Sequence, residues 1–172
     1  MSVETGTEQF ADAIRAKLQT EKEKNIKHLE SILPDAERMY DENMLVAERF
    51  NIIESFRSAA QVHRNITKKK ARVEISQRPR IDYNIEFDPT LLNIEGHPQL
   101  NIQFIWEPVR SKGLEHSIEV AIFGDTLFIF SGKEKDEPYS IREMDGDKLN
   151  QLLFEAYNNP RTPFEKVDSC II

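Results

Sequence analysis

The chain has 172 residues, of which 39% are hydrophobic and 31% are charged, and its formal net charge is −7. This size predicts one domain, or one domain with an extended arm, and the low counts of glycine (6) and proline (8) exclude a collagen-like repeat. Apolar runs are short and Cys170 is the only cysteine, so we expect no membrane span, no secretory leader and a reducing, cytoplasmic location.

The N-terminal segment, residues 1–68, predicts two long helices. Apolar side chains recur every three or four residues from Phe10 to Leu33, and Pro34 then predicts the end of the first helix because proline lacks a backbone donor. The second helix should run to about residue 68, since neither glycine nor proline interrupts it. The short connection predicts an antiparallel helical hairpin.

Apolar residues spaced seven apart in this second helix suit a coiled-coil seam. They are Met39, Val46, Ile53 and Ala60. Two interpretations stay open for them. The hairpin could project as an arm that forms a homodimer, or both helices could pack on their own domain.

The central segment predicts antiparallel strands, because apolar and polar residues alternate with a period of two. The alternation is clear over residues 81–88 and 100–107. Residues 116–123 and 126–131 should form a hairpin around Gly124 and Asp125, and weaker strands are expected at 72–77 and 138–142. Residues 69–160 are therefore predicted to form an antiparallel sheet of about five or six strands with one helix.

That helix is predicted from Leu149, Leu152, Leu153 and Ala156, which have helical spacing. Either aspartate of Asp145-Gly146-Asp147 can cap its first turn, and Asn158-Asn159-Pro160 should end it. Residues 161–172 then read as a flexible tail. The predicted fold class is α+β, with a long N-terminal helical hairpin, an antiparallel sheet, and a C-terminal helix packed on one face of that sheet.

The sequence contains none of the common catalytic motifs. It has no phosphate-binding glycine-rich loop and no nucleophile elbow, and its four histidines lack metal-ligand spacing. We therefore expect no catalytic residues, no metal site and no cofactor.

Charge is distributed unevenly along the chain. Residues 1–56 carry a net charge of −5, residues 57–80 carry +7, and residues 81–172 carry −9. The basic segment is a candidate surface for nucleic acid or for another charged partner. Its members are Arg57, Arg64, Lys68, Lys69, Lys70, Arg72, Arg78 and Arg80. The structural alternative is that these cations face the end of a helix and pair with acids of their own domain.

Acidic residues fall on the polar side of the predicted strands. They are Asp82, Glu86, Asp88, Glu107 and Glu119. Such a face either keeps the sheet soluble or binds a basic partner.

These patterns predict a non-enzymatic binding protein, such as an adaptor, an inhibitor or a chaperone-like protein, that acts through protein contacts and self-association. The alternative is a nucleic-acid-binding protein that uses residues 57–80. A weaker alternative is a small-ligand pocket between the sheet and its helices, because such pockets leave no sequence motif.

Overall fold

The computed structural model describes residues 3–83, 94–95, 100–110, 113–133 and 138–162. The chain divides into two compact units. The first unit contains Met1–Arg38 and Gln77–His97, and the second contains Met39–Ser76 and Pro98–Ile172. Each unit has its own apolar cluster.

The N-terminal segment forms one very long helix, α1 (Val3–Arg49), followed by a shorter one, α2 (Ile52–Thr67). The predicted helix end at Pro34 is wrong, because Pro34 lies inside α1. A proline in a helix interior costs about 3 kcal/mol, but the helix is held by burial on both sides of it. Leu29 before the proline is 6% exposed, and Tyr40 after it is 7% exposed.

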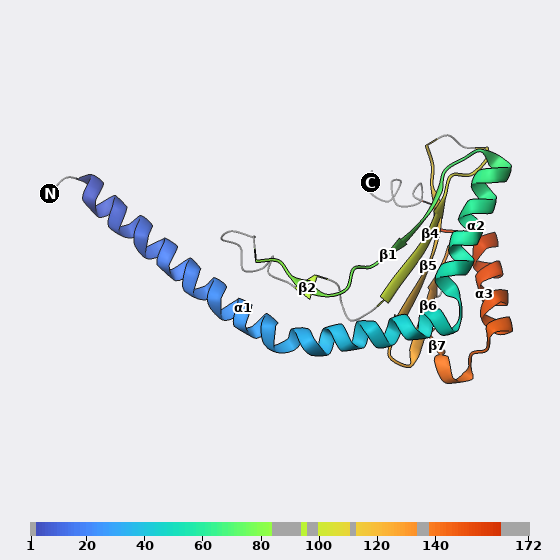
Figure 1. The fold of residues 1–172 in the computed structure, drawn as a ribbon. Coiled ribbons are helices and arrows are strands. Elements are labelled where there is room, and N and C mark those ends of the chain that lie inside the picture. Colours follow the sequence, from blue (N-terminus) through green and yellow to red (C-terminus); the bar gives the residue numbers. More distant parts are fainter. Residues whose placement is uncertain (1–2, 84–93, 96–99, 111–112, 134–137, 163–172) are drawn as a thin grey trace. The chain divides into compact units, whose positions relative to one another are not determined.

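The break between the two helices falls instead at Phe50 and Asn51. Asn51 has a left-handed backbone conformation with φ of 56°, which ends the regular helix geometry. The last turns of α1 and the start of α2 meet there at a bend (Figure 1). Asparagine adopts this conformation more readily than most residues, which explains why the chain turns without glycine or proline.

Five strands form one antiparallel sheet in the second unit, in the spatial order β1-β4-β5-β6-β7. Their bounds are β1 (Ala71–Ile75), β4 (Leu100–Trp106), β5 (His116–Phe123), β6 (Thr126–Phe130) and β7 (Pro138–Ser140). The predicted hairpin is confirmed, because β5 pairs with β6 from Phe123 opposite Thr126 to Glu119 opposite Phe130. A short 3-10 turn, η1 (Ile141–Glu143), takes the place of the predicted end of the last strand.

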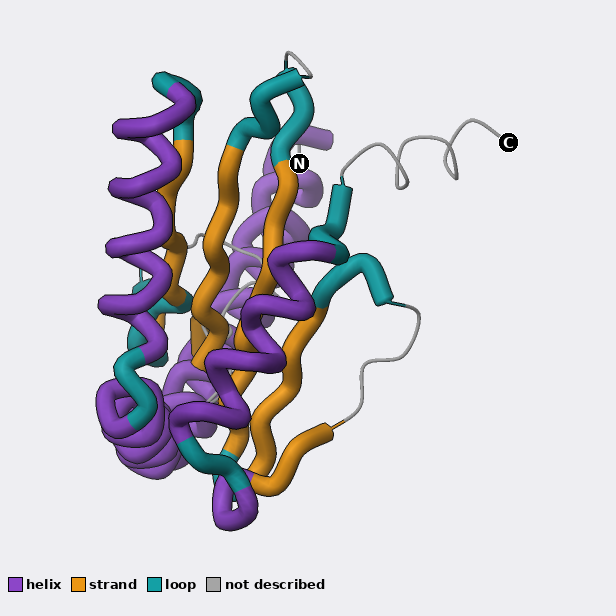
Figure 2. Tube along the Cα trace, turned by 90° about the vertical axis from the view of Figure 1, so that its right-hand side faces the viewer, coloured by secondary structure: helices purple, strands orange, loops and turns teal. Residues whose placement is uncertain are grey.

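Two helices cover one face of this sheet. Contacts place α2 over β1 and β4, and place α3 (Gly146–Asn158) over β5 and β6; Figure 2 shows both helices in front of the same face of the sheet. Ile102, Val120 and Ile122 are fully buried between the two layers. Trp106 is 5% exposed and stacks on Phe104 at 4.7 Å, so the tryptophan belongs to the core, as the alternation of β4 predicts.

The last turns of α1 close one end of this core. The side-chain oxygen of the buried Asn43 accepts a hydrogen bond of 3.1 Å from the backbone amide of Gly124. The Tyr40 hydroxyl donates to the carbonyl of Ser76. These two bonds attach α1 to the turn between β5 and β6 and to the end of β1.

The helix α3 matches its prediction at both ends. Asp145 is the N-cap residue, and its carboxylate accepts a hydrogen bond of 2.7 Å from the amide of Lys148. The helix ends at Asn158, before Pro160. The first residues of the predicted tail are held, because the backbone of Arg161 pairs with Ser117, and residues 163–172 lie outside the described part of the chain.

The first unit contains residues 3–38 of α1 and two short strands, β2 (Arg80–Ile81) and β3 (Ile94–Glu95). Leu29 and Ile81 are buried against each other. Of the strand predicted over residues 81–88, only Ile81 lies in a strand, and residues 84–88 are outside the described part.

Together these elements confirm the α+β class, the antiparallel sheet of five strands and the C-terminal helix on one sheet face.

Candidate functional site

The sheet has two edge strands, and they differ in how easily another strand could pair with them. The strand β7 has three residues and begins with Pro138, which has no backbone donor. Short edge strands and edge prolines are common protections against pairing between chains. The strand β1 has five residues and no proline, so it is the edge of the sheet with greater capacity to accept a strand.

The pairing of β1 with β4 shows which backbone groups of β1 point away from the sheet. The amide of Glu107 donates to the carbonyl of Lys70, and the amide of Ser76 donates to the carbonyl of Asn101. In an antiparallel ladder, alternate residues make these bonds, so the even-numbered residues of β1 face β4. The amides and carbonyls of Ala71, Val73 and Ile75 therefore face outward.

Within the described residues, only one of these outward groups has a partner. The guanidinium of Arg64 donates a hydrogen bond of 2.7 Å to the carbonyl of Ala71. The outward amides and carbonyls of Val73 and Ile75 make no hydrogen bond with any residue that the structure describes. This outer edge, Ala71–Ile75, is named the β1 edge below.

A groove of about 370 Å³ lies next to one end of the β1 edge. Its lining comes from the end of α1, the start of α2 and the end of β1. Its apolar lining residues are buried or half-buried and its polar and charged ones are exposed; the lining residues are Met44, Ala47, Glu48, Asn51, Ile53, Glu54, Arg57 and Ile75. The volume suits one or two side chains of a bound segment.

The predicted basic residues are divided between the two units. Arg78 and Arg80 belong to the first unit, and the other six belong to the second. Lys68 ends α2 in a left-handed conformation with φ of 59°, so the three lysines lie at the turn into β1.

At least four of these eight cations lie close to an acid of the same unit. Arg57 pairs with Glu54 at 3.0 Å, Lys69 lies 3.8 Å from Glu107, and Arg78 pairs with Glu37. These contacts are what the structural alternative predicts for the basic segment.

The guanidinium of Arg72 makes the most extensive contacts of this set. It donates two hydrogen bonds, of 2.7 and 3.2 Å, to the carboxylate of Glu115 and one of 2.9 Å to Glu74. The bond from Arg72 and its positive charge lower the pKa of the Glu115 carboxyl. Arg72 and Glu74 therefore place one positive and one negative side chain on the face of β1 that points away from α2.

The predicted acidic residues are also divided between the units. Asp82 belongs to the first unit, and Glu86 and Asp88 lie outside the described residues. Glu107 lies beside Lys69, whereas Glu119 accepts a 3.4 Å hydrogen bond from Gln103 across the strand pair. Glu107 and Glu119, the two acids of this set in the second unit, therefore each have a different polar neighbour.

The four residues of the predicted seam do not share one helix. The break at Phe50–Asn51 separates Met39 and Val46 in α1 from Ile53 and Ala60 in α2. Val46 and Ile53 pack against the core, and Ala60 is 2% exposed inside it.

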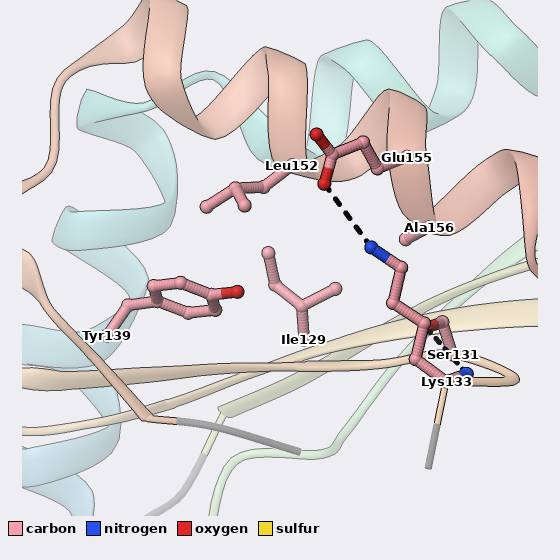
Figure 3. Close-up of a pocket in the computed structure, with 7 residues that line it drawn as sticks. All are labelled: Ile129, Ser131, Lys133, Tyr139, Leu152, Glu155 and Ala156. Atoms are coloured by element: carbon pink, nitrogen blue, oxygen red, sulfur yellow. Dashed lines mark hydrogen bonds and ion pairs between the residues drawn. The ribbon is translucent and has the colours of Figure 1, made fainter. Parts of the chain in front are cut away.

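A small cavity lies between α3 and the sheet (Figure 3). Its volume is about 30 Å³, which is room for one or two water molecules and much less than a small-molecule site needs. Lys133 and Glu155 approach to 3.3 Å at its rim. The apolar side chains of Ile129 and Leu152 line the interior.

Among the described residues, no group of three His, Cys, Asp or Glu side chains is placed to hold a metal ion. No described helix is long and apolar enough to cross a membrane.

Comparison of the chain with protein-family models, with curated proteins and with solved structures gave no match in any of the three. Among the described residues, the β1 edge has the geometry that suits binding best.

Sequence reasoning placed a weak strand at 72–77 but did not identify it as an edge. The alternation of Arg72, Val73 and Glu74 is visible in the sequence, but the order of strands in a sheet is not. The outward backbone of Val73 becomes a candidate site only because β4, from a distant part of the chain, pairs with the other side of β1.

Proposed function

We propose that the protein is a non-enzymatic binding protein that holds an extended segment of a protein partner along the β1 edge. The outward backbone groups of Val73 and Ile75, which make no hydrogen bond within the described residues, carry this proposal. A partner strand would pair with them and extend the five-stranded sheet by one strand. Strand addition of this kind obtains affinity from main-chain hydrogen bonds and specificity from pockets for alternate side chains.

The groove beside Ile75 supplies such a pocket. Side chains of an added strand alternate between the two faces of the sheet, so those on the helix-covered face would lie beside Ile53 and Ile75. The apolar lining residues favour an aliphatic or aromatic side chain there, and the exposed Glu48 favours a neighbouring cation, whereas Glu54 is already paired with Arg57.

The proposal includes the cytoplasmic location expected from the single cysteine. Nucleic-acid binding by the basic segment, residues 57–80, stays the alternative function.

The test removes one outward donor and leaves the fold intact. Val73→Pro deletes the outward amide without touching a bond to β4, because proline is tolerated on the free side of an edge strand. Val73→Thr is the matched control, since threonine keeps both the amide and a β-branched side chain. Both variants and the unaltered protein are panned against a displayed library of random peptides.

We expect the unaltered protein and Val73→Thr to enrich peptides with apolar residues at alternate positions. We expect Val73→Pro to lose at least about tenfold of this binding, the equivalent of one to two hydrogen bonds. Circular dichroism and thermal unfolding show whether each variant is folded. Equal enrichment by a folded Val73→Pro variant would contradict the proposed function.

A further inference from the structure

We propose that the partner strand at the β1 edge is the β1 edge of a second copy, so that two chains form an antiparallel homodimer with its twofold axis at Val73. This inference rests on the proposed function, because it names the partner of the same edge. It places the self-association expected from the sequence on β1 instead of on a coiled-coil seam.

The outward hydrogen-bonding groups limit the possible registers. Only the odd-numbered residues of β1 have backbone groups that face outward. A symmetric antiparallel pairing must therefore place odd residues opposite odd residues, with its axis at residue 72, 73 or 74.

Charge selects one of these three registers. An axis at residue 72 would place Arg72 opposite Arg72 of the second copy. An axis at residue 74 would place Glu74 opposite Glu74 of the second copy. Like charges directly opposite one another destabilise a strand pair. An axis at Val73 instead places Arg72 opposite Glu74 on both sides of the axis, so the sequence Arg72-Val73-Glu74 is complementary to itself.

The same register also pairs the other outward residues. Ala71 of one chain lies opposite Ile75 of the other, so both chains use the outward amides and carbonyls of Ala71, Val73 and Ile75. The bond from Arg64 to the Ala71 carbonyl is compatible with this pairing, since a carbonyl oxygen has two lone pairs. The two five-stranded sheets would become one continuous sheet.

Helix α2 provides a second region of complementary charge. It runs antiparallel to β1, because Ile53 lies near Ile75 and Arg64 lies near Ala71. A twofold axis at Val73 brings the start of α2 in one chain toward the end of α2 in the other. The exposed Glu48 at the groove then approaches the basic turn Lys68–Lys70 of the second chain, whereas Glu54 is already paired with Arg57 of its own chain.

These helix contacts matter for the size of the interface. Stable interfaces bury about 1,200 Å² or more, and a pair of five-residue strands alone buries less. We therefore expect a dimer of moderate affinity that sediments as a mixture of monomer and dimer between micromolar and submillimolar concentrations.

The decisive experiment exchanges charges between two chains. Glu74→Arg gives a chain with two arginines at the paired positions, and Arg72→Glu gives a chain with two glutamates there. Arg72→Glu is combined with Glu115→Gln, because Glu115 would otherwise face a second carboxylate. Each variant alone is expected to dimerise at least about tenfold more weakly than the unaltered chain, since both cross-strand pairs become repulsive.

An equal mixture of the two variants should recover dimerisation, because every arginine then lies opposite a glutamate. Sedimentation equilibrium with one variant fused to a fluorescent tag measures the heterodimer. Lack of recovery in the mixture, with both variants folded by circular dichroism, would overturn the register.

A cysteine experiment tests the axis directly in a Cys170→Ser background. At a hydrogen-bonded pair the two Cα atoms lie about 5.5 Å apart, which is within the range that a disulfide spans. Val73→Cys is therefore expected to give a covalent dimer under mild oxidation. Ile75→Cys is the matched control and should give little, because its opposite residue is Ala71.

The outcomes separate this inference from the proposed function. A chain that stays monomeric but enriches peptides in a Val73-dependent way overturns the homodimer and leaves the proposed function in place. A chain that dimerises equally well as Val73→Pro also overturns the homodimer at this edge. A chain that neither dimerises nor enriches peptides overturns both.

Discussion

At the scale of single residues, Asp145 shows how one side chain fixes an element boundary. Its carboxylate accepts a hydrogen bond from the Lys148 amide, one of the free donors in the first turn of α3. The same aspartate was one of two candidates in the sequence, because Asp147 has the same chemistry two residues later. The extended backbone of Asp145, with ψ of 169°, decides between them.

Asp145→Ala should lower the free energy of unfolding by about 1 kcal/mol, because the first turn of α3 loses its cap. Asp147→Ala is the matched control and should have a smaller effect, since Asp147 retains only the interaction with the helix dipole. Urea denaturation followed by circular dichroism measures both. Equal losses in the two variants would contradict the assignment of the cap.

His116 should make the stability of the fold depend on pH. Its ring lies edge-on to Trp106 at 5.8 Å, and burial lowers the pKa of the imidazole below its ordinary value. The unfolded chain therefore binds this proton more readily than the folded chain does. The free energy of unfolding should fall as the pH decreases from the ordinary histidine pKa to the lower pKa of the folded state.

This pH dependence is measured by urea denaturation across that interval, together with the titration of the His116 ring proton by NMR. His116→Gln should remove this part of the slope. A His116 resonance that titrates at or above the ordinary histidine pKa would contradict the prediction.

At the scale of elements, the boundary between α1 and α2 separates what the sequence shows from what it hides. Pro34 is a strong helix-ending signal, yet the helix continues through it. Asn51 is a weak signal, yet its left-handed conformation makes the bend. Burial on both sides of Pro34 and the packing of Ile52 and Phe56 on the sheet outweigh the local preferences of the chain.

Substitutions at Asn51 should follow the cost of the left-handed conformation. Asn51→Val should lower the free energy of unfolding by about 1–2 kcal/mol, because a β-branched residue is strained at a φ of 56°. Asn51→Gly should leave stability unchanged or raise it. Thermal and urea unfolding compare the two, and a valine variant as stable as the glycine variant would show that the bend relaxes at no cost.

At the scale of the whole molecule, the net charge of −7 consists of segments of opposite sign. The structure places acids next to many of the cations, with Glu54 beside Arg57 and Glu115 beside Arg72. Local neutralisation reduces the field available to a distant polyanion, and the remainder of the chain repels it. The proposed dimer uses the same charges at short range.

This arrangement predicts weak binding to nucleic acid. Fluorescence anisotropy with single- and double-stranded DNA, at about 50 mM and about 200 mM salt, should show little binding, and changing Lys68, Lys69 and Lys70 to Glu should alter it little. Tight binding that weakens steeply with salt and disappears in the triple variant would instead support the nucleic-acid function.

The sequence by itself determined the class of the fold and most of its strands. Alternation identified β4, β5 and β6, and helical spacing with an aspartate cap identified α3, because these signals are local to each element. The candidate site at the β1 edge could not be identified from local signals. The residues of β1 were visible as a weak strand, but nothing local distinguishes an edge strand from a central one.

Only the tertiary structure decided that β1 is an edge and that α2 lies beside it. Strand order depends on which distant segments pair, and here the order places β4 on one side of β1 and, among the described residues, no strand on the other side. The charge pattern of Arg72 and Glu74 was present in the sequence from the start. It became an argument about a partner only when the hydrogen-bonding direction of Val73 was known, because that direction is set by long-range pairing.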